Sequence, residues 1–247
     1  MEEEQLLTKK ERRELRRQEK DAIHDSVVRK RALKRTAMWV LIIGALGGSV
    51  FAIYNYGDST GPTTAMIADA VNPADRIFGD TASKVTLIEY GDFQCPACAQ
   101  YEPIVQKVRN DFTGKIAFVY RHFPLSQHKN AKITAYASEA AGKQGKFWEM
   151  HDMIYAGQNA WANLSTDKTR GVLVKYAGTI GLDLKLFADQ MDSGEVKNKV
   201  DADYQSGLKA GVNATPTFIL NGKRIQPRSY DEFKQLIEQE LSAAANS

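Results

Sequence analysis

The chain has 247 residues, of which 43% are hydrophobic, so it can bury the core of one large domain or two small ones. Its net charge of +3 is unevenly spread. Residues 1–36 carry twelve Lys and Arg against eight Asp and Glu, whereas residues 57–247 carry twenty-one against twenty-two. Because the globular part is nearly neutral, the composition argues against a nucleic-acid-binding protein.

The first predicted element after the basic tail of residues 1–36 is a membrane anchor. Residues 37–56 contain no charged side chain, and a helix of that length spans about 30 Å, the thickness of a bilayer core. Trp39 lies near one end of the span, with Tyr54 and Tyr56 at the other. Basic residues precede the span and acidic ones follow it, which predicts a single pass with a cytoplasmic N-terminus and an extracytoplasmic domain. A buried core helix and a cleaved signal peptide are the alternatives, but the span lacks a polar face and is too long for a signal.

Residues 57–75 are rich in Gly, Pro and polar side chains and are expected to form a linker. The remaining residues, 76–247, predict an α/β domain whose middle, about 125–205, is a helical insertion. Hydrophobic periodicity and an Asn-Gly turn give the elements in chain order. They are strand 85–90, helix 95–112, strand 116–120, helices 129–156, 169–191 and 196–210, strands 217–220 and 223–225, and helix 230–243.

Cys95 and Cys98 are the only cysteines in the sequence, and they form Cys-Pro-Ala-Cys at the junction of a strand and a helix. That spacing and position are typical of a thiol–disulfide redox site. A disulfide closing so short a loop stabilises a fold little, so the pair is expected to react. Cys95 begins the helix, where the partial positive charge favours a thiolate nucleophile, and Cys98 is then the resolving thiol. Pro96 suits the first helical turn.

Two further features are candidates for the same site. Glu89 lies within an apolar strand, and alternation alone leaves open whether it faces solvent or the core. If buried, its pKa is raised and it can exchange a proton with Cys98. Thr215 and Pro216 precede the strand 217–220, and their peptide bond is either trans or cis. A cis bond would free the main chain of Thr215 to pair with an extended peptide.

The sequences EYGDFQCPAC and ATPTFILNG, with the helical block between them, resemble those of DsbA-like thiol–disulfide oxidoreductases. The resemblance is closest to the membrane-anchored members of bacteria and covers about residues 74–241. It implies a thioredoxin fold with an inserted helical subdomain, preceded by a single transmembrane helix. It also implies a buried acid at Glu89, a kink proline at Pro103 and a cis-proline at Pro216. Substrate is then expected to contact Thr215, Pro216, Pro96 and Ala97.

The resemblance implies a function outside the membrane, with no cofactor. We expect the pair to donate a disulfide to exported proteins with free thiols and to be recharged by a membrane redox partner, quinone-linked in the family. Ala97 stands where strongly oxidising relatives often have His, so the thiolate is expected to rely on the helix end alone and the couple to be less oxidising. A reductase or isomerase of the same fold therefore stays open, as does a peptide-binding chaperone, against which the paired thiols argue.

A metal site is the main rival use of a Cys-x-x-Cys motif. Zinc needs four ligands as a rule, and the sequence has no second such motif. His122, His128 and His151 do not have the spacing of a zinc finger, so no metal is expected. His122 follows a predicted strand and is expected at the domain edge near the cysteines, whereas Trp148 and Trp161 are expected in the core or a groove wall.

Overall fold

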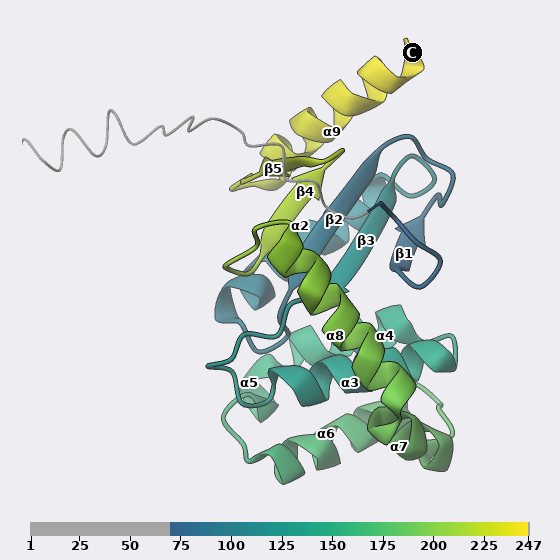
Figure 1. Cartoon of the computed structure of the whole chain (residues 1–247), viewed down its shortest axis with the longest axis vertical. Helices are drawn as coiled ribbons and strands as arrows, with labels where there is room; N and C mark the ends of the chain where they lie inside the picture. The colour runs from purple at the N-terminus through teal and green to yellow at the C-terminus, as the bar shows by residue number, and fades with distance from the viewer. Residues whose placement is uncertain (1–69, 247) are drawn as a thin grey trace, which may run out of the picture. The chain divides into compact units, whose positions relative to one another are not determined.

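The structure is a computed structural model that describes residues 70–246. In this part of the chain five strands form one mixed sheet, in the order β1-β3-β2-β4-β5 (Figure 1). β2 and β3 are parallel, and the other neighbouring pairs are antiparallel. The strands are β1 (Arg76–Gly79), β2 (Thr86–Gly91), β3 (Ala117–His122), β4 (Thr217–Leu220) and β5 (Lys223–Ile225).

Helix α2 (Pro96–Asp111) connects β2 to β3, and α9 (Tyr230–Ala245) follows the hairpin of β4 and β5. The helices between β3 and β4 include α3 to α7, which gather beyond one end of the sheet in Figure 1. This arrangement confirms the predicted order of a βαβ unit, a helical block and a ββα unit. The helices are α3 (Ala131–Lys143), α4 (Phe147–Ala156), α5 (Gln158–Trp161), α6 (Thr166–Thr179), α7 (Leu184–Asp192) and α8 (Gly194–Lys209).

Central strand β2 is buried on both faces because helices cover both sides of the sheet. Leu87 belongs to the larger core cluster, which also contains residues of α2 and α9. Ile88 and Tyr90 point to the opposite face, into a smaller cluster that contains Val119 and packs against Tyr204 of α8. Alternation therefore places Glu89 on the same face as Leu87, beneath α2.

β1 and α5 were not predicted from the sequence. β1 pairs with β3 at the edge of the sheet, and the indole Nε1 of Trp148 donates a hydrogen bond to the carbonyl oxygen of Ile77 at 3.3 Å. Just before β1, the buried carboxylate of Asp75 binds the guanidinium of Arg121 through both oxygens, at 2.8 and 3.0 Å. Asp75, which the sequence assigned to the linker, is thus part of the folded domain.

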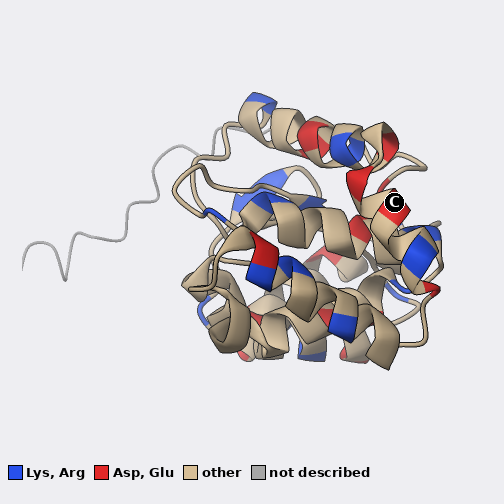
Figure 2. Ribbon diagram, turned by 90° about the horizontal axis from the view of Figure 1, so that it is seen from below, with Lys and Arg blue, Asp and Glu red and all other residues tan. Residues whose placement is uncertain are grey.

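The surface of the domain carries no dominant charge. Figure 2 shows Lys and Arg interspersed with Asp and Glu along its helices. Among residues 70–246, no helix combines the length and apolar character needed to cross a membrane. The predicted tail 1–36, the anchor 37–56 and most of the linker lie outside the described residues.

Candidate active site

A tight turn after β2 places Cys95 at the start of α2. Asp92 fixes this turn, because its main-chain oxygen accepts the amide of Cys95 at 3.0 Å and its Oδ1 accepts that of Gln94 at 2.8 Å. Cys95 has extended backbone angles and is the N-cap of α2, and Pro96 follows in the first turn. Proline fits there because the first helical residues have no intrahelical acceptor for an N–H. The strand, turn and helix thus place Cys95 where the sequence predicts it.

The two cysteines differ in burial. Cys95 is 7% exposed and Cys98, one turn further along α2, is 1% exposed, and both are free thiols. The thiol of Cys95 lies 3.4 Å from the main-chain oxygen of Thr215 and donates a hydrogen bond to it. The Thr215–Pro216 peptide bond is cis. The fold therefore brings Thr215 and Pro216 to the cysteines from about 120 residues along the chain.

The environment separates the acidities of the two thiols. A hydrogen bond from Cys98 is the main cause that lowers the pKa of Cys95 to about 5, against the effect of burial. Thr215 and the main-chain amides of Ala97 and Cys98 lower it further. Burial raises the pKa of Cys98 well above its usual value. Near neutral pH the pair therefore consists of a thiolate at Cys95 and a thiol at Cys98.

These contacts correct the expectation that the thiolate relies on the helix end alone. Ala97 has no polar side chain, but the thiol of Cys98 and the side chain of Thr215 both lower the pKa of Cys95. Within the described residues, Thr215 Oγ1 has no hydrogen-bond partner in this thiol state, so its hydroxyl is free to donate to the thiolate. The carbonyl oxygen of Thr215 thus accepts a hydrogen bond from the Cys95 thiol, and the hydroxyl of Thr215 can donate one to the Cys95 thiolate.

Glu89 is buried, which decides the alternative that the sequence left open. Glu89 is 1% exposed, and its Oε2 has no hydrogen-bond partner within the described residues. Burial raises the pKa of Glu89 to about 8, with Arg109 opposing the rise and Cys95 adding to it. Glu89 is therefore a neutral acid near pH 7. It lies close enough to the cysteines for a charge on Cys95 to raise its pKa, and for its own charge to raise the pKa of Cys98.

A charged group that the sequence did not predict continues this buried face of α2. Glu102 and Arg109 lie four and eleven residues after Cys98, which puts them on the same side of the helix. Arg109 Nη2 binds Glu102 Oε1 at 3.0 Å and Asp152 Oδ1 at 2.6 Å. Burial raises the pKa of Glu102 to about 9, although Arg109 opposes the rise. The spacing from Cys98 was the available signal, but hydrophobic periodicity marks only the apolar positions of α2.

Among residues 70–246, the histidines do not assemble with the cysteines into a ligand set. His151 is fully buried among aromatic rings, and burial lowers its pKa to about 4. His122 is also buried, where its Nε2 lies 3.0 Å from Glu139 Oε1, so its predicted position at the domain edge is wrong. Trp161 lies in the core, and Trp148 packs against it, as expected.

Two groups of His and acidic side chains resemble metal sites in composition, namely Glu102, His151 and Asp152, and His122, Glu139 and Asp203. In both groups the carboxylates already bind basic side chains. Arg109 binds the carboxylates of the first group, and Arg76 and Lys199 bind those of the second. A cation is disfavoured where a guanidinium or ammonium group already neutralises the carboxylates. Both groups are therefore hydrogen-bonded networks that already contain a basic side chain.

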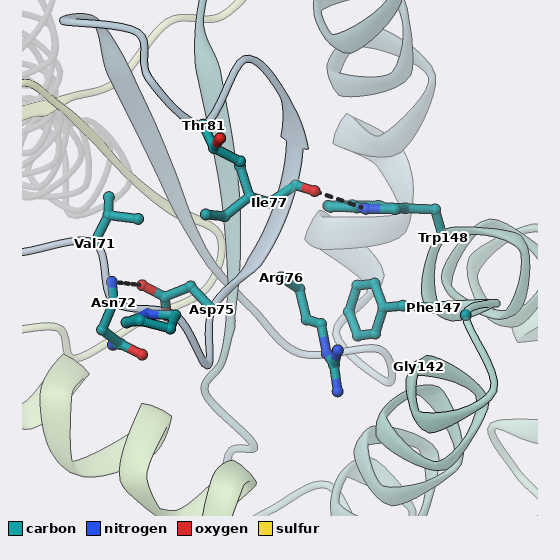
Figure 3. Close-up of a pocket in the computed structure, with 11 residues that line it drawn as sticks. Val71, Asn72, Asp75, Arg76, Ile77, Thr81, Gly142, Phe147 and Trp148 are labelled. Carbon is teal, nitrogen blue, oxygen red and sulfur yellow. Dashed lines mark hydrogen bonds between the residues drawn. The ribbon is translucent and has the colours of Figure 1, made fainter.

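A cavity of about 600 Å³ lies along β1, and neither cysteine lines it. Figure 3 shows Arg76, Phe147 and Trp148 on its walls, with Asn72 and Asp75 on the opposite side. The ring of Phe147 lies 5.4 Å from the guanidinium of Arg76. The cavity is therefore separate from the redox pair.

Comparison with known proteins agrees with the fold. A sequence model of the family described as Thioredoxin matches residues 71–239. The crystal structure of oxidised BdbD from Bacillus subtilis is similar, with a TM-score of 0.61 and 28% identity over 68% of this chain and 94% of that one. α-DsbA1 from Wolbachia pipientis has a TM-score of 0.64 with 20% identity, over 71% and 94% of the two chains, and supports the fold.

The curated relatives that match this chain include Na(+)/H(+) antiporters. A Na(+)/H(+) antiporter NhaA 1 from Salinispora arenicola is 39% identical over 151 residues, which are 61% of this chain. The match spans only 22% of that antiporter's length, so its name does not describe this chain. The family match, the fold and the redox pair agree with one another. The chain belongs to the thioredoxin family, and its fold is similar to those of BdbD and α-DsbA1.

Proposed function

We propose that this protein donates a disulfide to exported proteins outside the cytoplasmic membrane. The observation that carries the proposal is the position of the Cys95 thiol at the start of α2, 3.4 Å from the carbonyl oxygen of Thr215. A hydrogen bond from Cys98 lowers the pKa of Cys95 to about 5, and burial raises the pKa of Cys98. A stabilised thiolate favours the reduced form of a cysteine pair, and a couple with a stable reduced form is a strong oxidant. The disulfide form is then the one that oxidises substrates, and the dithiol form is the product of that reaction.

The exchange proceeds in two steps from the disulfide form. A substrate thiolate attacks Cys95 Sγ, the bond between Cys95 and Cys98 breaks, and Cys98 leaves and takes a proton. Glu89, neutral near pH 7, is the proposed proton donor because its pKa lies between those of the two thiols. A second substrate thiolate then attacks the substrate sulfur of the mixed disulfide, and Cys95 leaves as a stable thiolate. Two electrons pass from the substrate to the pair, and the substrate gains a disulfide.

Substrate contacts are proposed at the rim of the pair. Pro96 is exposed and Ala97 half-buried, and both stand next to Cys95 at the start of α2. The carbonyl of Thr215 already accepts a hydrogen bond from Cys95, and when the thiol is replaced by a mixed disulfide it is free for a main-chain amide of the substrate. Thr215 and Pro216 are thus proposed to hold the substrate as an extended segment.

An extracytoplasmic location and a membrane redox partner complete the proposal. Residues 37–56 have the length and composition of a membrane span, and the charges around them favour a cytoplasmic N-terminus. The reduced pair is proposed to return its electrons to a membrane oxidant, quinone-linked as in the resembling family, so that the protein needs no cofactor of its own.

A reductase or isomerase is the second candidate, and the absence of a polar side chain at residue 97 favours it. Equilibrating the Cys95–Cys98 pair with glutathione separates the two candidates. A potential more oxidising than that of glutathione is expected for a disulfide donor. A potential as reducing as that of thioredoxin, about −270 mV, would overturn the donor role.

A reduced, unfolded substrate that needs disulfides tests whether the pair acts on proteins. The oxidised protein is expected to restore that substrate's activity, and the Cys98→Ala variant is expected to accumulate mixed disulfides at Cys95. Failure of the parent protein in this assay, with no trapped substrate, would leave the peptide-binding chaperone as the remaining reading.

A further inference from the structure

The helical insertion makes direct hydrogen bonds to the main chain that carries Cys95. Gln158, the first residue of α5, is buried, and its Nε2 lies 2.7 Å from the carbonyl oxygen of Phe93 and 3.0 Å from that of Cys95. Two carbonyl oxygens around one atom require a donor with two hydrogens, so the amide nitrogen, and not its oxygen, occupies this position. A single side chain thus joins both residues that flank Gln94.

Gln94 makes the reverse connection, from the active-site turn to the insertion. Its Nε2 donates to the carbonyl of Ala162 at 2.7 Å, and its Oε1 accepts the amide of Asn130 at 2.6 Å. The side chain of Asn130 in turn holds the carbonyls of Ala162, at 3.3 Å, and Leu164, at 3.0 Å. The turn is therefore fixed to a segment that is itself held in place.

We infer that Gln158 is a positioning residue, through which the helical insertion sets the orientation of Cys95 and so the stability of its thiolate. Gln158 does not touch the sulfur. Together with the amide of Ala99, which donates to the same oxygen at 3.2 Å, it holds the carbonyl of Cys95 and the peptide plane that joins Cys95 to α2. The amides of Ala97 and Cys98 stabilise the thiolate only while that plane keeps the sulfur over the helix start. The inference deepens the proposed function, because Cys95 is the sulfur that the substrate attacks.

The variant Gln158→Met tests the inference, because methionine has a similar length but no N–H. The thiolate absorbance at 240 nm, followed against pH in the reduced full-length protein, gives the pKa of Cys95. We expect this pKa to rise by about one unit, the size of the loss of one hydrogen bond to a thiolate. The equilibrium with glutathione is expected to shift about tenfold toward the disulfide, because a less stable thiolate makes the pair a weaker oxidant.

Gln144→Met is the matched control. Gln144 also joins two segments of the insertion, since its Oε1 accepts the amide of Asp183 at 3.0 Å and its Nε2 donates to the carbonyl of Asp183 at 3.3 Å, but it is remote from the cysteines. This control is expected to keep the parent pKa of Cys95. Gln94→Met, which removes the reverse connection, is expected to raise that pKa as Gln158→Met does, and it decides the question if Gln158→Met does not fold.

Parent-like titration of Cys95 in folded Gln158→Met, or in Gln94→Met where only that variant folds, overturns the inference. An equal shift in the Gln144→Met control also overturns it, because the effect would then be a general loosening of the insertion. The titration needs no substrate, so its result is separate from the proposed function. A parent protein that fails to oxidise substrates defeats the function, whereas an unmoved pKa defeats only the role of Gln158.

Discussion

At the scale of single residues, the site holds acidic groups in opposite protonation states. Cys95 is held as a thiolate by hydrogen bonds, whereas Cys98 and Glu89 are held in their neutral forms by burial. Each of these states changes how stability varies with pH, because a group whose pKa differs between the folded and unfolded chain links protonation to folding.

The lowered pKa of Cys95 leads to a prediction about stability. The free energy of unfolding of the reduced protein is expected to rise, relative to that of the oxidised protein, as pH rises from 5 to 9. The folded pKa of Cys95 is lowered to about 5 from an ordinary value of 9.0, so the unfolded chain binds the extra proton in this window. The contribution is complete above the unfolded pKa and is lost as pH falls through the folded one. Urea unfolding of both redox forms at pH 5, 7 and 9 measures the difference. A difference that stays constant over this window would contradict the low pKa.

Glu89→Gln has two expected effects. Because the folded pKa of Glu89 is raised from 4.5 to about 8, its contribution is present below 4.5 and is lost as pH rises through 8. A neutral glutamine avoids this loss, so the variant is expected to be more stable than the parent at pH 7, by about 3 kcal/mol.

The same variant is expected to oxidise substrates about tenfold more slowly or worse, because Cys98 loses its proton donor. Stopped-flow reduction of the disulfide by a small thiol measures the rate. Glu139→Gln is a suitable comparison, since Glu139 is an equally buried carboxylate that serves Arg76 and His122. Equal rates in the Glu89 variant and the parent would assign proton delivery to another group.

At the scale of secondary-structure elements, buried ion pairs attach the edges of the fold to its centre. The segment before β1 is held by Arg121 of β3, which also donates to Tyr90 and Ser206 on its other side. Arg121 thus connects the entrance of the domain to the central strand and to α8.

Arg121→Met is expected to destabilise the domain by about 3–5 kcal/mol, because it leaves the carboxylate of Asp75 buried and unpaired. Chemical denaturation of the full-length protein measures the loss. The double variant with Asp75→Leu is expected to recover part of it, since no unpaired charge is then left. Absence of any recovery would mean that the contacts of Arg121 with Tyr90 and Ser206 dominate.

The sequence predicted the elements that have a local signal. β2 and α2 follow from apolar periodicity, and β4 and β5 from the Asn221-Gly222 turn, which the structure shows with positive φ at both residues. β1 has only four residues, too few for a periodic pattern, and its place is set by pairing with β3.

The same reasoning explains what could be predicted of the site. The roles of the two cysteines follow from their positions at the start of α2. Glu102 and Arg109 are hydrogen-bonded to each other inside the core, which hydrophobic periodicity cannot detect. Gln158 lies 63 residues from Cys95 and belongs to no motif, so only the folded structure reveals its contact.

At the scale of the whole molecule, the site exists only when three distant segments meet. The turn after β2, the start of α5 and the loop before β4 converge on Cys95. The acidity of Cys95 therefore reports on the integrity of the entire domain, including the helical insertion.

The full-length protein is predicted to stay in the membrane fraction after an alkaline wash, with residues 76–247 open to protease from the extracytoplasmic side. Introducing Ile43→Arg and Leu46→Arg is expected to release it, because each central arginine adds about 2.5–3.5 kcal/mol to insertion. Leu15→Arg, in the basic tail, is the control and is expected to keep the parent's distribution. Recovery of the parent in the wash supernatant would refute the anchor.

The short edges of the sheet have a consequence for the proposed exchange with unfolded chains. An exposed edge strand offers main-chain groups on which another chain can pair and aggregate. Here β5 has three residues and β1 has four, and the indole of Trp148 occupies the carbonyl of Ile77 on β1. The reduced, unfolded substrates of the proposed function would therefore find little free edge on which to extend the sheet. Repeated contact with them would not make this protein a template for their aggregation.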